Sequence, residues 1–353
     1  MNRRSFLGAA GALASTSLAG CTDLLQWQSP YAPPIAEDRP DAVYQPTHVE
    51  AMEMIGMQQT GPYGCALAYT YPHRFWLVTG TRTERVSITS EDSIHLMAVV
   101  WDRETGLVLP DASPAVDVTV AGESVTSLNP WTMLSQPMGT HFGDNVTLPS
   151  EGSYTFDVAI SPPSLPRYGS IPAGPEGGTN CSFDFEYSVA DRDALEITNF
   201  PEKQGTPGAV PTMEMDMLPA STVPRAAALP GRQIGTKTSG DADLVLTAID
   251  DASPFGGDTD QTYLVVSPRT PYNRYGLPFT SLAATIDRDG ETVFDGSLSA
   301  GLHPDLATHY GAVVDSLESG DDLSIVVEAP PQLSRHEGYE TAFIEMPDVQ
   351  LSV

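Results

Sequence analysis

The chain has 353 residues with 46 acidic and 17 basic side chains, so its formal net charge is −29. This balance argues against nucleic-acid binding, which needs clustered Lys and Arg on the protein surface. The acidic residues are spread along the whole chain and Lys occurs only at Lys203 and Lys237, a pattern typical of proteins from salt-loving archaea, where high salt screens self-repulsion.

The first 21 residues carry a targeting pattern. A twin arginine, Arg3-Arg4, precedes Ser5-Phe6-Leu7, and a short apolar run ends in Leu18-Ala19-Gly20-Cys21. The run is shorter than the ~20 apolar residues that a transmembrane helix needs. Residues 1–21 are therefore predicted to be a twin-arginine lipoprotein signal, with Cys21 as the lipidated residue. This places the protein on the extracytoplasmic face of the cell membrane.

Residues 22–46 contain five prolines and few large apolar side chains, which predicts a semi-rigid tether. After it, short runs of β-branched and aromatic residues alternate with polar ones and are separated by turn residues. No stretch shows a sustained helical period, so we expect an all-β chain. We expect one β-sandwich over residues 47–220, a linker over 221–240 and a second β-sandwich over 241–353. Cys65 and Cys181 remain after Cys21, and outside the cytoplasm we expect them to form a disulfide.

The second half of the chain repeats motifs of the first half. His141-Phe142-Gly143 is followed by a Pro pair and Arg167, and His309-Tyr310-Gly311 is followed at the same separations by a Pro pair and Arg335. Repeats at a fixed spacing indicate two diverged copies of one structural unit.

The stretch Gly139-Thr140-His141-Phe142-Gly143-Asp144-Asn145-Val146, followed by a Pro/Gly turn and a Tyr-bearing strand, is similar to the signature of the P19/Tp34 family of periplasmic iron-uptake proteins. The resemblance implies an immunoglobulin-like β-sandwich in each copy. It also implies binding of copper or iron and a role in ferrous iron uptake.

The family's site combines histidines, a methionine and a carboxylate. His141 matches the motif directly, Met133 or Met138 matches the methionine with a shifted spacing, and His73 or His95 would supply the upstream imidazoles. The family carries a His-x-Glu pair on one strand, but neither His73 nor His95 is followed by Glu at that spacing. Thioether and imidazole ligands select copper, whereas imidazole with carboxylate suits ferrous iron or zinc.

In the second copy, His309 and His336 are the candidate ligands; Ser334-Arg335-His336 resembles the family's late Gly-Arg-His element, whereas the first copy has Pro166-Arg167-Tyr168. For each of these histidines the alternative is a structural role, with the imidazole hydrogen-bonded inside the core. His48, close to the tether, is expected to lie outside the site.

The sequence lacks the nucleophile-elbow, zincin-helix, phosphate-loop and dinucleotide-loop motifs, so we expect a protein that is not an enzyme. The favoured function is metal binding in iron uptake, with an iron permease as a candidate partner and a homodimer left open. The alternative is a non-enzymatic docking module at the cell surface without a metal site, and a copper or iron redox enzyme ranks third.

Overall fold

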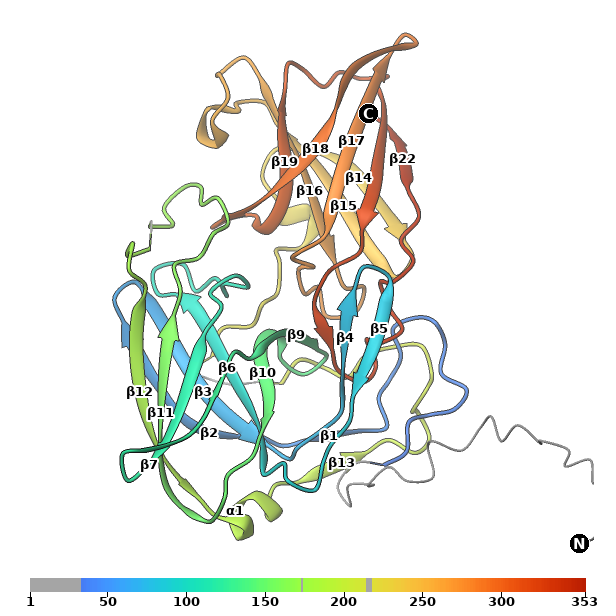
Figure 1. Ribbon diagram of the computed structural model, residues 1–353. Coiled ribbons are helices and arrows are strands. Elements are labelled where there is room, and N and C mark those ends of the chain that lie inside the picture. The colour runs from blue at the N-terminus through green and yellow to red at the C-terminus, as the bar shows by residue number, and fades with distance from the viewer. Residues whose placement is uncertain (1–32, 173, 214–217) are drawn as a thin grey trace, which may run out of the picture.

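The computed structural model describes residues 33–172, 174–213 and 218–353 (Figure 1). The predicted signal with Cys21 and the first part of the tether lie outside these residues. Within them no helix is long and apolar enough to cross a membrane. The chain is nearly all β, as predicted, and its strands form two units, here called the first and second copies.

In the first copy the elements are β1 (His48–Glu50), β2 (Glu53–Thr60), β3 (Tyr63–Thr70), β4 (Phe75–Thr79), β5 (Arg82–Val86), β6 (Ile94–Asp102), β7 (Ala115–Val120), β8 (Glu123–Leu128), β9 (Trp131–Ser135), β10 (Gly139–Val146), β11 (Gly152–Ile160), β12 (Thr179–Tyr187), the short helix α1 (Val189–Asp193) and β13 (Ile197–Asn199). One sheet has the order β2-β3-β6-β10-β9-β21-β4-β5, and a second has the order β12-β11-β7-β8.

In the second copy the elements are η2 (Ala226–Ala228), β14 (Arg232–Ser239), β15 (Ala242–Ile249), η3 (Ser253–Phe255), β16 (Thr262–Arg269), β17 (Ser281–Arg288), β18 (Glu291–His303), β19 (Ala307–Val314), β20 (Asp322–Ala329), β21 (Ser334–Arg335) and β22 (Val349–Ser352). Its strand order is β14-β15-β16-β19-β18-β17-β20-β22. The first part of strand β18 pairs with β17 and its last part pairs with β19. In the first copy the corresponding pairings are made by two separate strands, β8 with β7 and β9 with β10.

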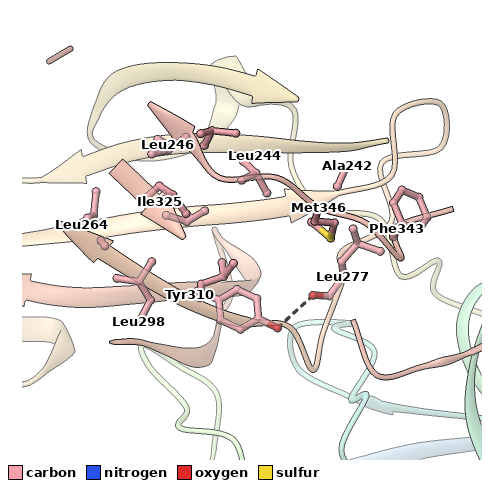
Figure 2. Close-up of a cluster of buried hydrophobic side chains, with 14 of the residues drawn as sticks. Ala242, Leu244, Leu246, Leu264, Leu277, Leu298, Tyr310, Ile325, Phe343 and Met346 are labelled. Atoms are coloured by element: carbon pink, nitrogen blue, oxygen red, sulfur yellow. Dashed lines mark hydrogen bonds between the residues drawn. The ribbon is translucent and has the colours of Figure 1, made fainter. Parts of the chain in front are cut away.

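The core of each copy follows from strand alternation. In β11, Tyr154, Phe156 and Val158 are buried and the residues between them are more exposed, because successive side chains point to opposite faces of a sheet. The second copy packs Leu244, Leu264 and Ile325 in the same way, and the Tyr310 hydroxyl donates to the Leu277 carbonyl (Figure 2). These apolar interiors are the main driving force for folding.

Strands β3 and β6 are buried along their whole length, so the sheet that contains them is covered on both faces. Leu96, Ala98 and Val100 of β6 point into the sandwich core. Alternation therefore places His95 and Met97 on the other face of the sheet.

Two predicted boundaries are corrected by the packing. The tether was expected to run to residue 46, but Val43 and Tyr44 are buried, and the Tyr44 hydroxyl hydrogen-bonds the carboxylate of Glu340. The linker was expected over 221–240, but Arg232–Ser239 forms strand β14 of the second copy. A register shift between Gln233 and Gly235 interrupts the alternation there, which hides the strand from sequence inspection.

Candidate metal centre

The outer face of the first sheet carries three of the predicted ligands. Phe142 of β10 points into the sandwich core, so His141 and Gly143 point outward, and His141 lies opposite Met133 of β9. On the other side of β10, Gly143 lies opposite Met97 of β6, two residues from His95. Adjacent antiparallel strands therefore bring His95, His141 and Met133 together.

The fourth ligand position comes from the second copy. Strand β21 enters the first sheet between β9 and β4, where Ser334 pairs in parallel with Met133 and Arg335 with Leu134. The next backbone N–H, that of His336, donates to the Leu134 carbonyl at 3.1 Å. The sequence predicted His336 as a ligand of the second copy, and the structure instead places it at the site of the first copy.

Arg335 fixes this crossing segment. Its buried guanidinium donates to the carbonyl oxygens of Pro331 at 2.8 Å, Ala342 at 2.9 Å and Leu333 at 3.2 Å. A buried charge is tolerated only when it is hydrogen-bonded, and three carbonyls satisfy that requirement. Burial lowers the pKa of Arg335 to about 9. The segment thus holds the His336 side chain in a defined position.

The side chains form a compact cluster, here called the histidine cluster: His73, His95, His141, His336 and Met133. One ring nitrogen each of His73, His95 and His336 lie within 4.8 Å of one another, so these three residues could hold a metal ion. The rings of His73 and His95 stack with centroids 3.9 Å apart, and those of His141 and His336 are 5.1 Å apart. The His336 Nε2 and the Met133 Sδ are 3.2 Å apart.

Hydrogen bonds set the tautomers of two of the imidazoles. The His141 Nδ1 donates to the Gly139 carbonyl at 3.0 Å, because a carbonyl oxygen can only accept. The His95 Nδ1 lies 2.9 Å from the side-chain oxygen of Asn145, whose amide nitrogen donates to the His73 carbonyl. In both imidazoles the proton is then on Nδ1, so Nε2 carries a lone pair, and neither Nε2 has a hydrogen-bond partner. Such outer partners orient the imidazoles of metal sites.

Gly143 makes the close approach possible. A Cβ atom at this position would lie 2.7 Å from the His95 Nε2 and 3.1 Å from the Met133 Sδ. Any other residue here would push these two groups away. The glycine of the His-Phe-Gly motif is therefore part of the site, in addition to its histidine.

The imidazoles of the cluster are poor bases in this environment. Burial lowers the pKa of His95 to about 3 and that of His141 to about 4, and it lowers the pKa of His73 and His336 well below the usual value. Neutral imidazole is the form that binds metal. Unpartnered nitrogens of neutral, buried imidazoles next to a thioether are a donor set that fits a soft or borderline transition-metal ion.

The cluster opens into a cavity of about 70 Å³, lined among others by His48, Glu50, Met52, Met97, Met138, His141 and His336. The Glu50 carboxylate lies 3.0 Å from the His48 Nε2 and 3.8 Å from the His73 Nδ1. Of the two predicted methionines, Met133 lies in the cluster and Met138 lines the cavity. His48 was expected to lie outside the site, but it lines this cavity, which corrects that expectation. Glu50 was missed, although His48 and Glu50 form a His-x-Glu pair on strand β1, the spacing sought after His73 and His95.

Two further predicted residues lie elsewhere. The structure does not bring His309 to the cluster: its Nδ1 donates to the Ala307 carbonyl at 3.1 Å and its Nε2 lies 3.2 Å from the Tyr263 hydroxyl. Both nitrogens are thus used, and His309 has the structural role that the sequence left open. Cys65 and Cys181 are buried free thiols that hydrogen-bond each other, which raises the pKa of Cys65. Their disulfide stays a prediction.

Comparison with known proteins gives three findings. A family model described as a domain of unknown function (DUF7350) matches residues 227–352, which is the second copy. No curated protein matches the chain.

Among solved structures, the chain is similar to a copper-bound variant of FetP from uropathogenic Escherichia coli, with 17% identity, a TM-score of 0.31, and coverage of 39% of this chain and 97% of that one. It is also similar to a copper-bound variant of P19 from Campylobacter jejuni, with 16% identity, a TM-score of 0.32, and coverage of 39% of this chain and 98% of that one.

Proposed function

We propose that this chain is a lipid-anchored extracytoplasmic protein that binds a transition-metal ion at the histidine cluster and assists iron uptake, and that it is not an enzyme. The observation that carries the proposal is the set of unpartnered ring nitrogens on His73, His95 and His141, gathered beside His336 and Met133. Buried polar atoms normally have hydrogen-bond partners, so several unpartnered ring nitrogens gathered in one place indicate that they bind a ligand.

Copper is the favoured ion. Imidazole nitrogens and a thioether sulfur together suit copper, especially Cu(I), since thioether is a soft ligand. Ferrous iron is the second candidate, because the Glu50 carboxylate at the cavity adds a hard oxygen donor near His73. The His-Phe-Gly-Asp-Asn motif, which resembles the P19/Tp34 signature, supports the same two ions and the link to iron uptake.

The remaining parts of the proposal rest on the sequence prefix. The twin-arginine pattern and Cys21 support export and lipid anchoring, which would hold the metal site near the membrane and near an iron permease. The cavity beside the cluster gives an ion a route to the buried imidazoles.

Metal titration of the purified full chain tests this function. We expect copper binding to weaken by at least tenfold in His141→Ala and in His336→Ala, since even outer partners of metal ligands contribute about 10–100-fold in affinity. His303→Ala is the matched control, because His303 lies in the second copy and accepts a hydrogen bond from the Asp305 N–H. Unchanged copper affinity in both site variants would favour the docking module instead.

A further inference from the structure

We propose that the second copy contains a latent counterpart of the histidine cluster, in which Tyr168, Tyr263 and Gly301 stand at ligand positions and the Tyr263 hydroxyl and the Tyr168 ring occupy the space of the ion. The chain therefore binds one ion at the histidine cluster and none at the counterpart. This inference rests on the proposed function of the first cluster, and it concerns residues to which that function assigns no role.

Strand registers establish the equivalence of three positions. His141 of β10 lies opposite Met133 of β9, and His309 of β19 lies opposite Gly301 of β18. The next residue of β10, Phe142, pairs with Ala98 of β6, and the next residue of β19, Tyr310, pairs with Val266 of β16. His95 and Tyr263 each lie three residues before these partners. Tyr263 thus stands at the position of His95, and Gly301 at that of Met133.

A reciprocal strand exchange establishes the fourth position. Arg335 of the second copy pairs in parallel with Leu134 of the first, and Arg167 of the first copy pairs in parallel with Leu302 of the second. The following N–H donates to the same partner in each case, at 3.1 Å from His336 to the Leu134 carbonyl and at 2.9 Å from Tyr168 to the Leu302 carbonyl. Each copy thereby completes the other, and Tyr168 stands at the position of His336.

The hydrogen bonds show how the counterpart is closed. His309 donates from Nδ1 to Ala307 just as His141 donates to Gly139, so the Nε2 of each points to the equivalent space. In the first copy this nitrogen is unpartnered, whereas in the second it accepts from the Tyr263 hydroxyl at 3.2 Å. The Tyr168 ring lies beside this pair, with its centroid 6.2 Å from that of Tyr263 and 6.0 Å from that of His309.

Packing closes the remaining space. A Cβ at Gly301 would lie 2.6 Å from the Tyr168 ring, so that ring fills the place of the methionine. Phe255 stacks on Tyr263 with centroids 3.9 Å apart and planes inclined by 5°. Ring packing thus fills this space, and the Tyr263 hydroxyl satisfies the His309 Nε2 that an ion would otherwise contact.

The test restores two imidazoles in the full chain with the double variant Tyr168→His/Tyr263→His, which together with His309 gives three imidazoles at the counterpart. Copper per chain is measured by elemental analysis after gel filtration, with circular dichroism to confirm the fold. We expect one equivalent in the native chain and two in the double variant. Adding His309→Ala to the double variant should return it to one.

A folded double variant that holds no more copper than the native chain would overturn the inference. If the native chain holds none but the double variant gains one, the inference stands and the proposed function fails. Tyr263→Phe provides a second measurement that does not depend on the double variant folding. Loss of the hydroxyl should lower the Tm of the metal-free protein, because the His309 Nε2 loses its hydrogen-bond partner. The copper content should stay unchanged. An unchanged Tm would contradict a counterpart closed by that hydroxyl.

Discussion

Gly143→Ala should weaken metal binding while the protein stays folded. The added Cβ would meet the His95 Nε2 at 2.7 Å and the Met133 Sδ at 3.1 Å. Non-bonded heavy atoms prefer separations of about 3.5–4.0 Å, so the imidazole must move by roughly 0.8 Å. Binding constellations need ligands held within about 0.5 Å, and we therefore expect copper affinity to fall about 10–100-fold.

The fold should tolerate this substitution. Gly143 lies inside strand β10 and does not have a positive φ, so alanine fits its backbone conformation. Alanine in a strand is favoured over glycine by about 0.5–1 kcal/mol from chain entropy, which offsets the crowding. Affinity is measured by competition with a copper chelator and stability by thermal melting.

The matched control is Gly177→Ala, since a Cβ at that position would meet nothing within 4 Å. Its copper affinity should equal that of the native chain. If folded Gly143→Ala binds copper as tightly as the control, then His95 and Met133 do not hold the ion together, and the assignment of the site is refuted.

Three further predictions concern the scaffold. Phe156→Ala should destabilise the first copy by about 3–5 kcal/mol in chemical denaturation, because Phe156 is fully buried and the truncation leaves a cavity; a loss below about 1 kcal/mol would contradict this packing. Exposure of the protein to an oxidant should join Cys65 to Cys181, closing a long loop and stabilising the protein by about 4–5 kcal/mol; two thiols still titratable after oxidation would contradict it. Hydrogen bonds from Arg288 hold the pKa of Asp321 below its usual value, so their stabilisation is complete above the unfolded-state pKa and is lost as pH falls through the folded-state pKa. Thermal melts of Arg288→Gln and the native chain should therefore differ at neutral pH and converge in acid, and a constant difference would argue against this bond.

Local patterns were sufficient to predict the fold class. Alternation in Tyr154, Phe156 and Val158 predicted a half-buried strand, and the structure has β11 there. His141 was singled out because the stretch around it resembles the P19/Tp34 signature, and the structure places it in strand β10 opposite Met133. The spacing of His141 and His309 to Arg167 and Arg335 predicted two copies, and the strand registers agree with that prediction.

Long-range pairing was beyond sequence inspection. His336 and Met133 are 203 residues apart, and the repeat spacing assigned His336 to its own copy. Nothing local indicates that the segment after β20 crosses to the other sheet, because a parallel pairing depends on the packing of both copies. The substitution of Tyr263 for a ligand is likewise visible only when the registers of β6 and β16 are compared.

The residues that connect the copies were misjudged from composition. Val43 and Tyr44 belong to a Pro-rich stretch that resembles a tether, yet both are buried: Val43 packs in the core of the second copy, and the Tyr44 hydroxyl hydrogen-bonds Glu340. Burial of this kind depends on which surface the chain meets, and composition alone carries no information about that.

The most direct test of the account is the copper stoichiometry and ligand environment of the native chain. Metal-free protein is titrated with Cu(I) against a competing chelator, and the loaded protein is studied by X-ray absorption spectroscopy. The account predicts one tightly bound ion per chain with nitrogen and sulfur ligands, and loss of the sulfur signal in Met133→Leu. No binding, or an unchanged spectrum in Met133→Leu, would contradict a metal centre built from the histidine cluster.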